Sequence, residues 1–121
     1  MARDAFRFLP LFLPVAETAR QNTWLPSVDI YRARGGWLVK FDLAGVRPQD
    51  IEWTVSKNLL TVRGARRDCM VEEGCSHYRM EIAYSRFERQ VEIPGDLSTA
   101  RITTEHRDGM LLVRIRWENA S

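Results

Sequence analysis

The sequence predicts an all-β fold, an immunoglobulin-like β-sandwich of roughly six to eight short strands. Three observations lead to this prediction. Several short segments alternate apolar with polar residues, turn-forming residues separate them, and after about Trp24 no stretch of helix length shows the helical period. At 121 residues the chain has room for one domain with one modest core.

The alternating segments are expected to be strands that turn one face to the core and the other to water. Trp37, Val39 and Phe41, for example, share one face, while Lys40 and Asp42 lie on the other. In chain order the expected strands are 28–31, 37–43, 51–55, 60–62, 87–93, 102–106 and 111–117.

Turn-forming residues separate these strands. Gly35-Gly36 and Asp108-Gly109 are dipeptides typical of tight hairpins. The other turns contain residues such as glycine, proline and asparagine, which favour backbone conformations that strands do not use. They are expected at 44–50, 56–58 and 94–95.

The connection between Arg67 and Ser85 is about seventeen residues long, which is unusual for a minimal sandwich. Its second half, 78–84, alternates like a strand, but no tight turn folds it back on its neighbours. A strand on a long arm can pair with the sheet edge of another chain. The alternative is an ordinary edge strand in the same subunit. The residues assigned here to a dimer interface are Tyr78, Arg79, Met80, Glu81 and Ile82.

Motif-like segments follow one another between residues 24 and 117. They read WLPSVDI at 24–30, DLAGVRPQDI at 42–51, LLTVRG at 59–64, FERQVEIP at 87–94 and TEHRDGML at 104–111. They resemble the motifs W-x-P-x-x-D-I, D-L-P-G-V-x-x-x-D-I, L-x-I-x-G, F-x-R-x-F-x-L-P and A-x-x-x-N-G-V-L of the α-crystallin domain of small heat-shock proteins. Ala44 stands where the second motif usually has proline.

The resemblance implies an ATP-independent holdase chaperone for partly unfolded client proteins, and an arm strand that is exchanged between the subunits of a homodimer. It implies an α-crystallin domain at 24–117, between a flexible apolar segment at 1–23 and a short tail at 118–121. The sequence contains neither G-x-x-x-x-G-K-[ST] nor G-x-S-x-G, so no enzyme activity and no cofactor are predicted. The alternative is a co-chaperone-like sandwich module that docks on a folded protein partner.

Arg89 shares a predicted inward row with Phe87, Val91 and Ile93, where a charge is costly unless it is paired. The resemblance implies that this arginine lies at the dimer interface. An ion pair with Glu81 or another acid of the exchanged strand is therefore expected. The alternative is a side chain that extends along the sheet to water at its rim.

The resemblance also implies a groove between two edge strands, which in the family receives an I-x-[IV] motif from the tail of another subunit. The groove residues here are Trp53, Val55, Ile102 and Thr104. The sequence ends at Ser121, shortly beyond the last expected strand, and shows no such motif there. A dimer or a small assembly is therefore expected in place of a large cage.

The segment 6–15, FRFLPLFLPV, is strongly apolar. Pro10 and Pro14 disfavour a continuous helix or a central strand. The segment is therefore expected to be a sticky surface for clients, with a secretory signal peptide and a hook packed on the sandwich as alternatives. The residues assigned to client binding are Phe6, Phe8, Leu9, Leu11, Phe12 and Leu13.

Composition narrows the partners and the chemistry. With 18 basic and 16 acidic residues, the net charge of +2 gives no electrostatic case for nucleic acid, and no apolar stretch is long enough to span a membrane. Two cysteines make no disulfide framework and favour a reducing, cytoplasmic compartment. Cys69, Cys75 and His77 have zinc-ligand chemistry without the spacing of a structural site, so a redox response and two incidental cysteines are the other interpretations. His106 is predicted to be structural.

Overall fold

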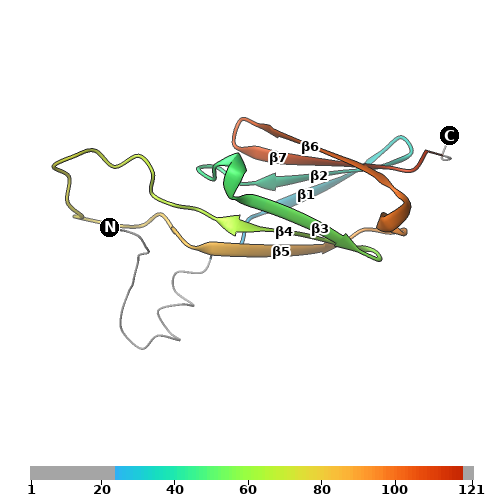
Figure 1. Cartoon of the computed structure of the whole chain (residues 1–121), viewed down its shortest axis with the longest axis horizontal. Helices are drawn as coiled ribbons and strands as arrows, with labels where there is room; N and C mark the ends of the chain where they lie inside the picture. Colours follow the sequence, from blue (N-terminus) through green and yellow to red (C-terminus); the bar gives the residue numbers. More distant parts are fainter. Residues whose placement is uncertain (1–23, 119–121) are drawn as a thin grey trace, which may run out of the picture.

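The computed structural model describes residues 24–118. They form seven strands in two antiparallel sheets that face each other (Figure 1). One sheet has the strand order β1-β2-β7-β6 and the other β3-β4-β5. The strands are β1 (Val28–Ala33), β2 (Gly36–Asp42), β3 (Ile51–Ser56), β4 (Leu59–Ala65), β5 (Arg86–Glu92), β6 (Arg101–Arg107) and β7 (Met110–Arg116). The prediction of an all-β sandwich is confirmed.

The core lies between the two sheets and consists of the apolar rows that the alternation predicts. Phe41 on β2 and Val113 on β7 are fully buried on one side, and Leu60 and Val62 on β4 are fully buried on the other. Burial of such a side chain stabilises the fold by about 1.5–3 kcal/mol. Because a register shift of one residue would turn a whole row to water, these rows also determine how the strands pair.

Two hairpins are tight, as their turn residues predict. Asp108 and Gly109 join β6 to β7 with φ angles of 53° and 78°, both in the left-handed region. A two-residue turn with this geometry matches the twist of its flanking strands. The β1–β2 turn falls at Arg34 and Gly35, one residue earlier than predicted, and Gly35 has φ 72°.

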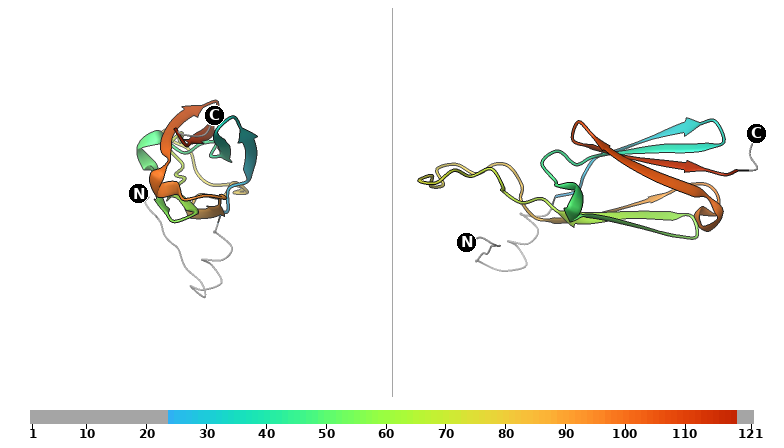
Figure 2. Two further views of the ribbon diagram at one scale, coloured as in Figure 1. Left: turned by 90° about the vertical axis from the view of Figure 1, so that its right-hand side faces the viewer. Right: turned by 45° about the horizontal axis from the view of Figure 1, so that its top comes forward.

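Two short 3₁₀ turns carry the chain from one sheet to the other. The turn η1 (Pro48–Asp50) precedes β3, and η2 (Leu97–Thr99) precedes β6. Leu97 is buried, and its N–H donates a hydrogen bond to the Lys57 carbonyl at 2.8 Å. This contact docks η2 on the β3–β4 hairpin, so β6 starts beside that hairpin, and β3 and β6 lie on the same side of the sandwich (Figure 2).

Candidate association site: the arm, its base and the free sheet edges

Residues 66–85 form a long arm between β4 and β5 that extends beyond the sandwich (Figure 1). Its segment 78–84, expected to be a strand, is irregular, because within residues 24–118 no sheet edge pairs with its backbone. The alternative of an ordinary edge strand in the same subunit is therefore wrong. Pairing with a second chain stays a prediction. The exposed fractions of its large apolar residues are 98% for Tyr78, 51% for Met80 and 61% for Ile82.

Arg66 fastens the two ends of the arm to each other. Its backbone N–H donates to the Ser85 carbonyl at 2.9 Å, and its Nε donates to the Ala83 carbonyl at 2.8 Å. Its Nη1 reaches the Ala44 carbonyl at 3.2 Å, and the guanidinium stacks on Trp24, 3.7 Å from the ring centroid. Burial lowers the pKa of the Arg66 guanidinium, partly opposed by nearby acidic groups. One side chain thus connects both limbs of the arm to the body of the domain.

Trp24 extends this connection into the core. Its ring meets that of Phe87 edge to face, with centroids 5.2 Å apart. Sequence reasoning missed the role of Arg66, because this residue lies beyond the alternating rows and belongs to none of the motifs. The only signal nearby is the tryptophan that opens the first motif.

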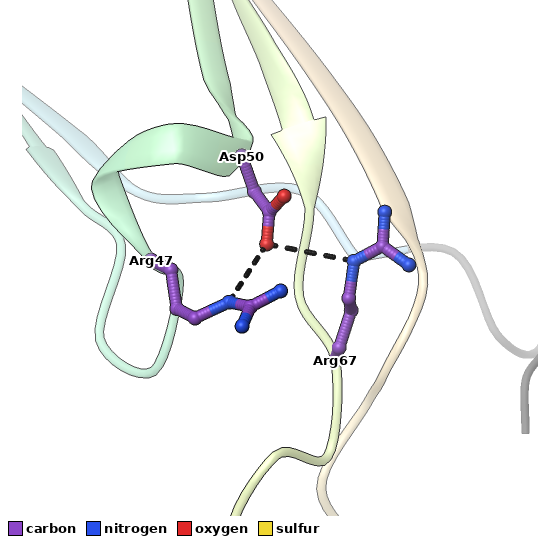
Figure 3. Close-up of polar contacts among 3 residues, drawn as sticks. All are labelled: Arg47, Asp50 and Arg67. Atoms are coloured by element: carbon purple, nitrogen blue, oxygen red, sulfur yellow. Dashed lines mark hydrogen bonds and ion pairs between the residues drawn. The ribbon is translucent and has the colours of Figure 1, made fainter.

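A second contact holds the base of the arm against η1 (Figure 3). The Asp50 Oδ2 atom accepts a hydrogen bond from Arg47 Nε at 3.2 Å and lies 3.5 Å from Arg67 Nε. The Asp50 side chain is 15% exposed, while those of Arg47 and Arg67 are 49% and 59% exposed. Ion pairs open to water contribute about 1 kcal/mol or less. The main effect of this cluster is therefore to orient the outgoing limb at Arg67.

β1 is a free edge of the four-stranded sheet. It pairs with β2 on one side, and no other strand in the described range pairs with it. Ile30 and Tyr31 on this strand are each 43% exposed. An unpaired edge that carries apolar side chains is a template for another strand. The described residues thus contain a sheet edge, at β1, that no further strand covers. They also contain an alternating segment, 78–84, that pairs with no sheet.

Arg89 lies on β5 in the same inward row as the buried Phe87 and is half-buried. Its Nη1 donates to the Pro26 carbonyl at 2.9 Å, which links β5 to the chain just before β1. Within residues 24–118 no acid forms an ion pair with Arg89, and Glu81 instead lies 3.5 Å from Arg79. The carbonyl partner was not predicted from the sequence, and the ion pair between subunits stays a prediction.

Replacing Arg89 with methionine is expected to lower the free energy of unfolding by about 1–3 kcal/mol, because the carbonyl of the buried Pro26 loses its donor. Methionine keeps much of the aliphatic stem, so little packing is lost. Urea unfolding followed by tryptophan fluorescence measures the change, with Arg89→Lys as the control that retains a donor. A methionine variant as stable as the parent would contradict the assignment. Light scattering on both variants checks the expectation that the dimer weakens and aggregation increases.

The four predicted groove residues lie on β3 and β6, the free edges on the same side of the two sheets (Figure 2). Trp53 is 37% exposed, and Thr104 is also exposed. Val55 and Ile102 are half-buried and pack against the core. These edges therefore carry a partly apolar surface, and its use as a docking groove stays a prediction.

The remaining sequence-based candidates form no additional site among the described residues. No group of three or more His, Cys, Asp or Glu side chains in residues 24–118 could hold a metal ion, so Cys69, Cys75 and His77 do not form one. His106 lies on β6, and its buried Nε2 has no hydrogen-bond partner in this part of the chain. The client-binding residues assigned within 6–13 lie outside the described range. No helix of residues 24–118 is long and apolar enough to cross a membrane.

The described residues thus form a sandwich with open sheet edges and a projecting arm that carries exposed apolar side chains. Comparison with known proteins identifies the family. Residues 29–121 match the Hsp20/alpha crystallin family, and the chain belongs to that family. Small heat-shock proteins are chaperones rather than enzymes, in agreement with the prediction from the sequence.

Curated relatives carry names of the same kind. The 18 kDa antigen 2 of Mycobacterium avium is 30% identical over 115 residues, which cover 95% of this chain and 81% of that protein. The 18 kDa heat shock protein of Streptomyces albus G is 34% identical over 91 residues, or 73% of this chain and 62% of that protein. Small heat shock protein C2 of Rickettsia felis is 22% identical over 102 residues, and this chain spans 66% of its length.

Solved structures show the same fold. The hspA protein of Xanthomonas axonopodis is 32% identical, with a TM-score of 0.64 over 81% of this chain and 98% of that one. A small heat-shock protein of Xylella fastidiosa is 29% identical, with a TM-score of 0.65 over 81% of this chain and 90% of that one. These similarities support the assignment of the described residues to an α-crystallin domain.

Proposed function

We propose that the chain is an ATP-independent holdase chaperone that binds partly unfolded proteins and suppresses their aggregation under stress. Membership of the Hsp20/alpha crystallin family supports the chaperone role. The observation that carries the proposal is the position of the large exposed apolar residues, which lie on the arm, on the edge strands β1 and β3 and, in the case of Leu25, shortly before β1. Such surface marks sites of interaction. In the described range these residues are Leu25, Ile30, Tyr31, Trp53, Met70, Val71, Tyr78, Met80 and Ile82.

The proposed dimer forms when the segment 78–84 of each copy adds to the free edge of β1 in the other copy. The segment alternates and has no partner strand within residues 24–118, and β1 has an open side. Arg89 supports this arrangement because its hydrogen bond to Pro26 places it beside the start of β1. A strand that arrives there would bring an acid near the guanidinium, and Glu81 is the acid proposed to pair with it.

The segments of the chain have separate roles in this proposal. Residues 1–23 bind clients, residues 24–117 form the dimerising sandwich, and 118–121 follow it as a short tail. The partly apolar edges of β3 and β6 are a second docking surface, supported by the exposure of Trp53. The assembly is a dimer or a small oligomer, and the protein acts in the cytoplasm, where exposed free thiols are kept reduced in the absence of oxidative stress.

The experiment heats a labile enzyme with and without this protein, in the absence of ATP, and follows aggregation by light scattering. Aggregation is expected to be suppressed at a ratio of about one subunit per client, because one subunit is needed to bind each exposed apolar client surface. An unrelated β-sandwich domain at the same mass concentration is the control. Client aggregation at the control rate would contradict the holdase function and favour a module that docks on folded partners. Native mass, expected at about twice the chain mass of 14.1 kDa, tests the dimer separately.

A further inference from the structure

Both cysteines of the chain lie on the arm, and both are exposed free thiols. A turn separates them, because the Cys75 N–H donates a hydrogen bond to the Glu72 carbonyl at 3.2 Å. Gly74 within this turn has φ 91° and open space around it. The chain therefore changes direction between the two thiols, and even a Cβ added at Gly74 would meet no atom within 4 Å.

The two cysteines mark opposite ends of the outgoing part of the arm. Cys69 lies near the base, close enough to Tyr84 on the returning limb to influence its ionisation. Burial and then the charge of Asp68 raise the pKa of the Tyr84 hydroxyl, and Cys69 adds a smaller effect in the same direction. Cys75 is the last residue of the turn and lies shortly before the segment 78–84. A bond between these thiols would therefore join the base of the arm to the start of the segment proposed for exchange.

We propose that Cys69 and Cys75 are a redox modification site, at which a low-molecular-weight disulfide converts them to an intramolecular disulfide that shortens the arm and weakens strand exchange. The effect on exchange rests on the proposed dimer, whereas formation of the bond does not. The site takes a small, soluble disulfide of the glutathione type as its oxidant.

The reaction balances as two successive thiol–disulfide exchanges. The thiolate of one cysteine attacks a sulfur of the small disulfide, which breaks its S–S bond and releases one small thiol. The second cysteine thiolate then attacks the mixed disulfide, forms the Cys69–Cys75 bond and releases the second small thiol. The protein loses two electrons and two protons, and the small disulfide gains them.

The geometry of a disulfide between Cys69 and Cys75 limits how far this part of the arm can extend. Six extended residue steps span about 20 Å, whereas a disulfide holds its two Cα atoms about 4.4–6.8 Å apart. The bond therefore limits this part of the limb to roughly a third of its extended length. Closure within one arm is favoured over a bond between two molecules because the short intervening loop keeps the thiols at high effective concentration.

In the proposed dimer, the arm shortened by the disulfide would reach less far toward the partner subunit. The segment 78–84 begins three residues after Cys75, so a limb held back at Cys69 draws the segment away from β1 of the partner. Each backbone hydrogen bond that fails to form weakens the exchange. We expect the dissociation constant of the dimer to rise at least about tenfold, which corresponds to about 1.4 kcal/mol.

The test compares the full chain after treatment with oxidised glutathione and after reduction. Intact mass and peptide mapping are expected to show a loss of about 2 Da in a peptide that links Cys69 to Cys75, as disulfide formation requires. Sedimentation at several concentrations is expected to show the weakened dimer, with recovery on reduction. Cys69→Ser and Cys75→Ser are the matched controls, because each leaves one exposed thiol and should keep the parent dimer under oxidation.

The outcomes separate this inference from the proposed function. Glutathione adducts or intermolecular bonds without the internal link would overturn the site. An internal link with an unchanged dissociation constant would overturn its effect on exchange. A reduced protein that is monomeric overturns the exchange dimer and the effect on it, while the mapped peptide still decides whether the disulfide forms.

Discussion

Gly64→Ala is expected to destabilise the domain by about 3 kcal/mol, near the upper end for added volume in a packed site. A Cβ atom at this position would lie 2.1 Å from the Asp50 carbonyl oxygen and 3.0 Å from Cζ of Phe87. The first of these neighbours is backbone and has no alternative rotamer. Gly64 pairs with Ile51 on one side and with Phe87 on the other, so the strain falls on the centre of the β3-β4-β5 sheet.

The same substitution should loosen the base of the arm. Asp50 must move away from β4 to relieve the overlap, and its carboxylate then loses its position between Arg47 and Arg67. Circular dichroism during heating measures the loss of stability. For a domain of this size each kcal/mol lowers Tm by about 4–8 °C, so a fall of roughly 12–24 °C is expected.

Gly74→Ala is the matched control for this prediction. Gly74, unlike Gly64, has a positive φ, 91°, but nothing lies within 4 Å of the added Cβ, and the residue belongs to the exposed arm. Its replacement should lower the free energy of unfolding by about 1 kcal/mol, the lower end of the penalty for a strained backbone, because the exposed arm can adjust. If both variants have the same Tm as the parent, close packing around Gly64 does not explain why glycine occupies this position.

Serine at all six apolar positions assigned to client binding is expected to abolish most client protection while the sandwich stays folded. A buried leucine or phenylalanine contributes about 1.5–3 kcal/mol of contact free energy, and serine removes that contribution. The core cluster of the described residues is formed by side chains between Trp24 and Trp117. The substituted residues are Phe6, Phe8, Leu9, Leu11, Phe12 and Leu13.

Client aggregation in the heating assay measures this effect, and at least about ten times more variant than parent should be needed for equal protection. The control replaces polar residues at 17, 18, 21 and 22 by serine, which changes the same part of the chain without removing apolar surface. Deletion of residues 1–20 should act like the six-residue variant and leave the dimer intact. Full protection by either variant would contradict the assignment of client binding to these six residues and would favour a client surface on the arm or at the β3 edge.

The fold could be predicted from the sequence because its information is local. Period-two alternation marks a strand wherever one face is buried, and the Asp108-Gly109 turn specifies its hairpin with two residues. The predicted strand 60–62 was too short, because the structure extends it over Leu59–Ala65, where Gly64 and Ala65 continue the pairing with backbone alone.

The association site was harder to predict because its contacts are not local. The partner of Arg66 Nε is a carbonyl 17 positions later, and that of Arg89 is a carbonyl 63 positions earlier. Every residue has a main-chain carbonyl, so the residue types do not show which carbonyl accepts a side-chain hydrogen bond. The segment 78–84 shows the opposite difficulty. Its alternation is visible in the sequence, but the edge that would make it a strand is absent from the rest of the described chain.

The hydrogen bond from the Arg66 N–H to the Ser85 carbonyl makes the arm a closed loop with both ends fixed on the sandwich. The entropy lost in closing such a loop grows with the logarithm of its length, so doubling the length adds only about 0.6 kcal/mol. Insertions near the tip should therefore leave the sandwich almost as stable while they extend the reach of the arm. Evolution can vary the choice of partner at the tip and preserve the stability of the domain at the base.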